Sequence, residues 1–599
     1  MKNFLKYTLA TIVGVIIVQA LLIFLLFGMI GAMATLGDKP VVIKNNSVLL
    51  MKLNGSISDR TPSNPFQNFD FLSLKPTTSL GLNKILQSIK KAAKDDRIKG
   101  IYLDLTDIQS NFGAMATTEE IRNALAEFKK SGKFIYSYTN LGYSQRSYYL
   151  ATVADSVFVN PETPVMLAGM GGVTFFYKEM LDKIGLKVEI VKVGKYKSAV
   201  EPFTQTEMSP SNRTQIETYL KSIWGNMLKG ISDSRHISTD TLNWLANHFD
   251  FRSTAEEKAY KLYDDCLYED QMIQLLKKRC GLPESAKLNI ATLKEYENAS
   301  LPGKAEFIKD KIALIYATGE IGLTQSDNSI GPELAQSIRK AREDKSVKAL
   351  VLRVNSPGGS ALVSDIIWRE VTLAAQEKPF IVSMGNVAAS GGYYISCAAD
   401  TIVADPMTLT GSIGIYGQFF TGEKLFKDKL GITASVVKTN EHSDFGGGYP
   451  LPLPISNRPL TSYEKNVLQK YIEKGYETFL NRVATGRHMT RDEVHEIAQG
   501  RVWTGEDALK VGLVDVLGGM EDAIKIAADK AGMEKYRIVE YPLEKDFFQE
   551  LIGSFSASIR ERTLRSEGGE YYETFRNLRN HLTIPQGPVA RIPYDLTLN

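Results

Sequence analysis

Cysteine is scarce in this chain of 599 residues: only Cys266, Cys280 and Cys397 are present, and their spacing fits no metal site. Their odd number also excludes a complete disulfide framework. Charge of one sign is not in excess either, because 71 Lys+Arg face 68 Asp+Glu with the signs interspersed. This balance argues against a nucleic-acid-binding protein. Since 43% of the residues are hydrophobic, wholesale disorder is excluded, and we expect roughly two to four globular domains.

Charged residues are also absent from a long N-terminal stretch between Lys6 and Asp38, where Tyr7–Gly37 is almost wholly apolar. As a helix this stretch would span about 46 Å, more than the roughly 30 Å of a hydrocarbon core. The apolar centre of a cleavable signal peptide is shorter, about 7–15 residues. A leader cleaved at the small residues Gly31, Ala32 and Ala34 is the alternative. The sequence predicts a membrane anchor over residues 1–37, and lysines on both flanks leave its orientation open.

The rest of the chain contains an internal repeat. Four collinear blocks align at an offset of about 245 to 249 residues, which is far too long for a solenoid. The blocks are Ser88–Lys99 with Ser337–Lys348, Tyr148–Pro161 with Tyr393–Pro406, Gly185–Lys192 with Gly431–Lys438, and Arg252, Ala259 and Lys261 with Arg501, Ala508 and Lys510. We therefore expect a duplicated domain, with copies at 46–303 and 304–540 and a tail at 541–599.

Each copy has the pattern of an α/β domain. In the second copy, strands are predicted at Lys311–Tyr316, Val347–Val354 and Pro379–Met384, and helices at Pro332–Asp344, about Leu362–Gln376 and Ala388–Ala398. This alternation predicts parallel crossover units with helices flanking the sheets.

Two segments fall outside this pattern. Ser58–Leu80 is an insertion-like loop rich in Pro, Ser, Asn and Phe, which either packs on the surface or touches substrate or membrane. In the tail, Phe548, Ile552, Phe555 and Ile559 form one helical stripe. That stripe fits a helix that packs on the body or another subunit, and alternatively a membrane-surface helix.

A candidate nucleophile is Ser390, which stands between Ala-Ala and Gly-Gly where a strand gives way to a helix. Such a backbone lets a reacting carbonyl approach closely, and amides at the start of a helix favour a developing oxyanion. The aligned residue of the first copy, Gln145, cannot be a nucleophile. Tight packing of a helix start is the alternative reading. A second candidate is the turn Asn355–Ser360, whose adjacent glycines could expose amides to an anion, although the same sequence also suits an ordinary turn.

A serine nucleophile needs a base, and none of the six histidines, His236, His248, His442, His488, His495 and His581, lies in a recognised triad or zinc motif. A lysine can serve if burial keeps it neutral, which requires lowering its pKa from about 10.4 to about 7–8. Lys197 aligns with Ser443 in the second copy, so one copy has the lysine and the other the serine. This complementary loss fits one composite site, although Lys197 by itself would be an ordinary solvated lysine.

Three stretches resemble the long form of the signal peptide peptidase A (protease IV) family: Gly194–Phe203, Asn355–Ser360 and Ala388–Ser396. The predicted anchor, the duplication and Arg501–Asp515 agree with that resemblance. It implies two tandem copies of a Clp protease/crotonase-like domain and a Ser–Lys endopeptidase. By the resemblance, Ser390 is the nucleophile, Lys197 the general base, and Ser412 the hydroxyl that bonds the lysine amine. Gly358, Gly359 and Gly391 match the oxyanion region.

The resemblance also implies released signal peptides and other hydrophobic unfolded peptides as substrates, no cofactor or metal, a membrane partner and a homotetramer. Its expected location is the bacterial inner membrane, with the catalytic body on the periplasmic side. The sequence leaves open whether lysine and serine meet within one chain or across subunits. Two rivals are an acyl-CoA enzyme, which would rely on acidic groups, and a non-catalytic membrane scaffold, which would have lost Ser390 or Lys197.

Overall fold

The structure is a computed structural model that describes residues 42–53, 55–61, 69–70, 75–76, 80–106, 115–163, 165–248, 250, 252–301, 308–323, 329–448, 455–542 and 589–591, with helical positions at 7, 11, 13–15, 17–19 and 21. Most of the expected anchor, most of the loop 58–80 and the tail stripe 548–559 lie outside these residues. Among the helices that the structure does describe, none combines the length and the apolar character needed to cross a bilayer.

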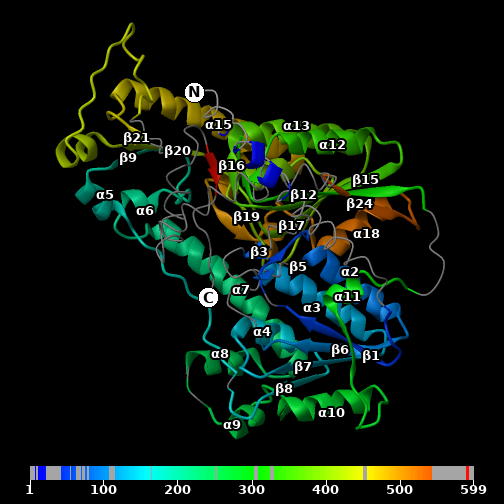
Figure 1. Cartoon of the computed structure of the whole chain (residues 1–599). Coiled ribbons are helices and arrows are strands. Elements are labelled where there is room, and N and C mark those ends of the chain that lie inside the picture. Colours follow the sequence, from blue (N-terminus) through cyan, green and yellow to red (C-terminus); the bar gives the residue numbers. More distant parts are fainter. Residues whose placement is uncertain are drawn as a thin grey trace.

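In the described part of the chain, the first half forms a six-stranded parallel sheet with the order β10-β8-β7-β6-β1-β11. Figure 1 labels its central strands β8, β7, β6 and β1. Its strands are β1 (Ser47–Lys52), β6 (Ile98–Asp104), β7 (Phe134–Thr139), β8 (Ser156–Val159), β10 (Asp265–Cys266) and β11 (Asn289–Thr292). Its helices are α2 (Leu82–Lys94), α3 (Met115–Lys129), α4 (Gln145–Ala151), α7 (Pro210–Arg235), α8 (Thr239–Asn247), α9 (Thr254–Ala259), α10 (Glu269–Arg279) and α11 (Leu293–Glu297). Helix α2 shows why they pack: its leucines and isoleucines recur every three or four residues and are buried.

The second half repeats this plan in an eight-stranded sheet, in which β23-β18-β17-β15-β12-β24 has the same order as the first sheet. Its strands are β12 (Lys311–Thr318), β15 (Val347–Ser356), β17 (Phe380–Ala389), β18 (Thr401–Ala404), β19 (Leu409–Gly411), β22 (Val502–Thr504), β23 (Val516–Leu517) and β24 (Arg537–Tyr541). Its helices are α12 (Glu333–Glu343), α13 (Ala361–Glu377), α14 (Gly391–Ser396), α15 (Ser462–Arg487), α16 (Arg491–Ile497), α17 (Gly505–Lys510) and α18 (Met520–Lys530). The α/β class is thus confirmed, while the predicted domain boundaries stay predictions.

A third, mixed sheet joins the two halves, with the order β14-β13-β16-β25-β20-β21 and β9 beside β20. Its strands are β9 (Lys187–Lys192), β13 (Glu320–Ile321), β14 (Ser329–Ile330), β16 (Gly358–Ser360), β20 (Tyr416–Thr421), β21 (Ile455–Ser456) and β25 (Val589–Arg591). Strand β9 belongs to the first half but pairs antiparallel with β20 of the second half along its whole length. Figure 1 shows β9 reaching from the first half to a position beside β20 and β21. The segment that follows β9 in the sequence therefore packs against the second half.

Shorter elements complete the fold. They are β2 (Ile57–Ser58) paired with β5 (Leu80–Gly81), β3 (Phe69–Asp70) paired with β4 (Lys75–Pro76), α5 (Lys178–Ile184), α6 (Glu201–Thr204) and the π-helical turn η1 (Leu425–Lys429).

The two halves also share a core and a buried ion cluster. Apolar side chains of both sheets belong to one continuous cluster, which includes Leu103 from the first half and Val351 from the second. At this boundary the fully buried Arg353 contacts two buried carboxylates of the first half, Asp59 at 2.7 Å and Glu120 at 2.5 Å. A buried cation is tolerated only when it is paired in this way.

Two sequence-based boundaries were wrong near Ser390. Strand β17 continues to Ala389 and does not end at Met384, because its second half gains a new partner: Val387–Ala389 pair with β19 after Ile381–Met384 pair with β18. The predicted turn Asn355–Ser360 holds a short strand, β16, which pairs with β13 and β25.

Candidate active site

Ser390 lies at the junction of β17 and α14 in a strained conformation. Its backbone has φ 56° and ψ −112°, a region that non-glycine residues rarely adopt and that is frequent at functional sites. Its amide donates to the carbonyl of Gly411 at 2.8 Å, and its side chain is fully buried. The glycine that follows allows close approach, because a Cβ on Gly391 would lie 3.1 Å from the nitrogen of Gly359.

Lys197 comes from the first half and reaches this serine. Its Nζ lies 2.8 Å from Ser390 Oγ, 3.0 Å from Ser412 Oγ and 3.1 Å from the carbonyl oxygen of Ser412. Lys197 and Ser390 thus meet within one chain. The lysine is fully buried, and this burial holds the pKa of its amine well below the ordinary value, since desolvation penalises the charged form.

The backbone around Lys197 is fixed by contacts with both halves. The amide of Tyr196 donates to the carbonyl of Gln499 at 3.0 Å, and Gln215 Nε2 donates to the carbonyl of Tyr196 at 3.1 Å. Gly500 lies directly against the lysine, because a Cβ there would come within 2.7 Å of Lys197 Cβ. The lysine is therefore held by backbone packing as well as by its amine contacts.

The glycine-rich turn lies beside the serine. Gly358 and Gly359 have φ values of 100° and 151°, which favour glycine. A side chain at Gly359 would collide with the carbonyl of Ile321 at 2.0 Å. Because a Cβ on Gly391 would also meet Gly358 Cα at 3.1 Å, the three glycines named from the sequence form one cluster next to Ser390.

A strand of the chain itself runs along this cluster. Residues 589–591 of β25 pair antiparallel with β16, opposite Ser360, Gly359 and Gly358 in turn, and Val589 also pairs with Tyr416 of β20. The site edge therefore accepts an extended backbone between β16 and β20. The sequence offered no signal for this strand.

The position of the first half that corresponds to Ser390 holds Gln145, whose side chain is engaged in hydrogen bonds with the backbone. Gln145 begins α4, and its Oε1 accepts hydrogen bonds from the amides of Ala168 at 3.0 Å and Gly169 at 2.9 Å. Its Nε2 donates to the carbonyl of Gly169 at 3.2 Å. A carboxamide with these partners supplies no hydroxyl, so this position of the first half holds no nucleophile that could match Ser390.

Comparisons with known proteins identify the family of the chain. The sequence profile described as peptidase family S49 matches residues 127–282 and 372–534. The chain is 33% identical to "Serine protease SPPA, chloroplastic" of Arabidopsis thaliana, covering 92% of this chain and 78% of that protein. It is 35% identical to "Protease 4" of Haemophilus influenzae, over 82% of this chain and 80% of that protein, and 36% identical to "Protease 4" of Salmonella typhi, over 87% and 81%. On the strength of these matches, the chain belongs to peptidase family S49 and is a serine peptidase.

Proposed function

We propose that this chain is a membrane-anchored endopeptidase in which Ser390 is the nucleophile and Lys197 the general base. The observation that carries the proposal is the 2.8 Å contact between Lys197 Nζ and Ser390 Oγ in a fully buried setting. Burial lowers the pKa of the lysine, which favours the neutral amine that a general base requires.

Ser412 has a positioning role in this proposal. A neutral amine has two N–H groups and one lone pair. If the N–H groups donate to the Oγ and the carbonyl of Ser412, at 3.0 and 3.1 Å, the lone pair faces the hydroxyl of Ser390. The proton of that hydroxyl then passes to Lys197 as Ser390 Oγ attacks the peptide carbonyl. The resulting ammonium protonates the leaving amine, and the same lysine later activates the water that hydrolyses the acyl-enzyme.

The negative charge of the tetrahedral intermediate needs N–H donors. We assign this role to the backbone around Gly358, Gly359 and Gly391, because these residues cluster beside Ser390 and fixed amides stabilise an oxyanion without reorganising.

The proposed substrates are released signal peptides and other hydrophobic unfolded peptides. Strand β25 supports an extended mode of binding, because a peptide that replaced it would add a strand beside β16 and β20. The apolar stretch Tyr7–Gly37 and the resemblance to signal peptide peptidase A support a single membrane anchor, a bacterial inner-membrane location with a periplasmic body, and a homotetramer.

In this scheme the anchor is 1–37, the repeat at 46–303 supplies the lysine, the repeat at 304–540 supplies the serine, and 541–599 is the tail. Each repeat has a Clp protease/crotonase-like fold. The shared strand order of the two parallel sheets supports the duplication.

The test is hydrolysis of fluorogenic hydrophobic peptides by the full chain in detergent micelles. Ser390→Ala and Lys197→Ala are expected to lower kcat/KM by at least about a thousandfold, as for other nucleophile–base pairs. Lys195→Ala is the matched control, since Lys195 is exposed and two residues away. A Ser390→Ala protein with wild-type activity would refute the nucleophile, and equal losses in the control would refute the specific role of Lys197.

A further inference from the structure

Gln215 of α7 has a buried side chain that bridges the two halves beside the candidate active site. Its Nε2 donates to the carbonyl of Tyr196 at 3.1 Å and lies 3.0 Å from Ser198 Oγ. These two residues stand directly before and after Lys197. Its Oε1 accepts from the amide of Val502 in β22 at 3.2 Å. One carboxamide, which is 2% exposed, therefore links the backbone of the lysine to a strand of the second half.

The orientation of this carboxamide is fixed by its partners. The carbonyl of Tyr196 can only accept a hydrogen bond, and the amide of Val502 can only donate one. Nε2 must therefore face the carbonyl and Oε1 the amide. Ser198 adds a further constraint, because its Oγ donates to Asn212 Oδ1 at 2.9 Å and so presents its lone pairs to Gln215. Turning the carboxamide over would break its bonds to both halves.

The strand that Gln215 holds also positions Ser412. The carbonyl of Arg501, the residue before Val502, accepts from the amide of Ser412 at 2.7 Å. Ser412 Oγ in turn lies 3.0 Å from Lys197 Nζ. The bond from Gln215 to Val502 thus fixes the backbone of the lysine relative to the residue that contacts its amine. A change in this bridge would move the amine relative to its partners.

A buried polar network holds the start of α7, which carries Gln215. Asn212, one turn before Gln215, donates through Nδ2 to Glu201 Oε2 at 2.9 Å. Ser209, the N-cap of the helix, donates through Oγ to Glu201 Oε1 at 2.6 Å. Asn212 and Glu201 are both buried. Because a satisfied buried network is rigid, the carboxamide of Gln215 has a fixed position relative to the lysine segment.

The matching helix of the second copy lacks this glutamine. Helices α7 and α15 each have 26 residues, and their N-caps Ser209 and Thr461 stand 252 positions apart. The same offset makes Val467 the counterpart of Gln215, and Val467 is 48% exposed. The second copy also has no base to hold, since Ser443 stands at the position of the lysine. The carboxamide thus belongs to the copy that supplies the lysine.

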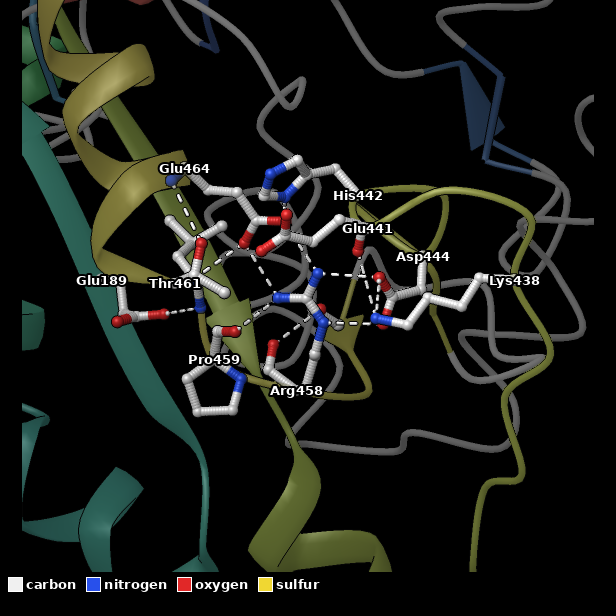
Figure 2. Close-up of polar contacts among 11 residues, drawn as sticks. Glu189, Lys438, Glu441, His442, Asp444, Arg458, Pro459, Thr461 and Glu464 are labelled. Atoms are coloured by element: carbon white, nitrogen blue, oxygen red, sulfur yellow. Dashed lines mark hydrogen bonds and ion pairs between the residues drawn. The ribbon is translucent and has the colours of Figure 1, made fainter.

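Figure 2 shows what holds the corresponding loop of the second copy. Asp444 is the counterpart of Ser198. Glu464 is the counterpart of Asn212, and Arg458 joins the two carboxylates at 2.8 Å each. An ion cluster therefore does in the second copy what neutral carboxamides of α7 do beside the lysine. A carboxylate near a buried amine favours the ammonium form, which cannot accept a proton, whereas a carboxamide bonds to the backbone without adding charge.

We propose that Gln215 is a positioning residue for the peptidase reaction, because its carboxamide holds Lys197 where the amine reaches Ser390. Gln215 bonds neither the amine nor the hydroxyl of this pair and acts through the lysine. The inference rests on the proposed function, in which Lys197 is the general base. A displacement of about 1 Å at a catalytic group can lower a rate about a hundredfold. The loss of this bridge is therefore expected to affect kcat more than substrate binding.

The test is a double-mutant cycle on peptide hydrolysis by the full chain in detergent micelles. Gln215→Met keeps the length of the side chain and removes both of its hydrogen-bonding ends. We expect kcat to fall by about ten- to hundredfold, while KM changes by less than about twofold, since the substrate edge at β16 and β20 is untouched. In a Lys197→Met background, the same substitution is expected to lower the residual rate by less than about twofold. A residue that acts through the lysine has nothing to position once the amine is gone.

Gln145→Met is the matched control. The Gln145 side chain is also a carboxamide of the first half that bonds the backbone, through two amides and one carbonyl, but it does not contact the lysine segment. Its loss is expected to leave kcat unchanged. Melting curves show whether each variant is folded. If Gln215→Met does not fold, Gln215→Asn, which shortens the bridge by one methylene, takes its place in the cycle.

Three outcomes would overturn the proposal. They are wild-type kcat in Gln215→Met, an equal loss of kcat in Gln145→Met, and a full loss from Gln215→Met in the Lys197→Met background, which would show that Gln215 acts independently of the lysine. Wild-type activity of Lys197→Met is a different result, because it would refute the proposed function and the role of Gln215 with it.

Discussion

Lys197 Nζ lies 2.8 Å from Ser390 Oγ although 193 positions separate the two residues in the chain. The contact depends on β9, which leaves the first half to pair with β20. Neither repeat could make it alone, since the first carries Gln145 where the serine would be, and the second carries Ser443 where the lysine would be. The duplication thus provides a buried lysine from one copy and a strained serine from the other.

Lys197→Met is expected to stabilise the fold near neutral pH while lowering kcat by at least about a hundredfold. Burial lowers the pKa of this lysine in the folded chain, whereas in the unfolded chain it is about 10.4. Between the two values the unfolded chain binds the extra proton, so the free energy of unfolding of the wild type rises with pH. Methionine removes this dependence, and its stabilising effect should shrink as the pH approaches about 10.

The measurement is guanidinium unfolding of both proteins at pH 7 and pH 10. The prediction fails if Lys197→Met is less stable than the wild type at pH 7, or if the difference between the two proteins does not change with pH.

Gly500→Ala is expected to reduce kcat/KM by about tenfold or more by displacing the lysine, because the new Cβ would lie 2.7 Å from the backbone and Cβ of Lys197. Gly512→Ala is the matched control. The two glycines have nearly equal φ values, 81° and 77°, but a Cβ on Gly512 meets only Met489 Sδ at 3.9 Å. Both variants carry the same backbone strain, roughly 1–2 kcal/mol. Peptide hydrolysis and melting curves of the two proteins separate displacement of the lysine from backbone strain. Similar losses of activity in both variants would contradict the prediction.

The sequence was sufficient for the α/β class, the repeat and the family, because these depend on periodicity and on short motifs around Ser390 and Lys197. The sequence did not predict that β17 continues to Ala389, since the strand is prolonged by pairing with β19. Local apolar pattern does not reveal a change of strand partner.

The buried arginine cluster was also invisible in the sequence. Asp59 lies in a segment interpreted as a surface loop, yet it is 3% exposed and bonds Arg353. The same holds for Gln215, whose side chain bonds the carbonyl of Tyr196 next to the lysine. A polar residue in a helix or loop is normally solvated, and only the approach of a distant element makes it part of the core.

Arg353→Met is expected to destabilise the fold by about 3–5 kcal/mol, because it leaves Asp59 and Glu120 buried without their cation. Replacing all three residues by apolar ones should recover much of that loss. Lys510→Met is the control: Lys510 is exposed and pairs with Glu506 and Asp507, and exposed pairs contribute about 0–1 kcal/mol. Urea unfolding of the three variants and the wild type checks this, and a loss of stability for Arg353→Met no larger than for Lys510→Met would contradict it.

Removing residues 588–599 is expected to lower KM for peptides without changing kcat. Strand β25 lies between β16 and β20, where a substrate would pair, so the two compete for one edge. If β25 occupies that edge nine-tenths of the time, apparent affinity for a peptide is reduced about tenfold, and truncation restores it. The control lacks only 592–599 and keeps β25, so its KM should equal that of the wild type. Steady-state hydrolysis of one fluorogenic peptide distinguishes the proteins. A fall in kcat for the longer truncation would show that the segment supports the site, because a pure competitor leaves kcat unchanged.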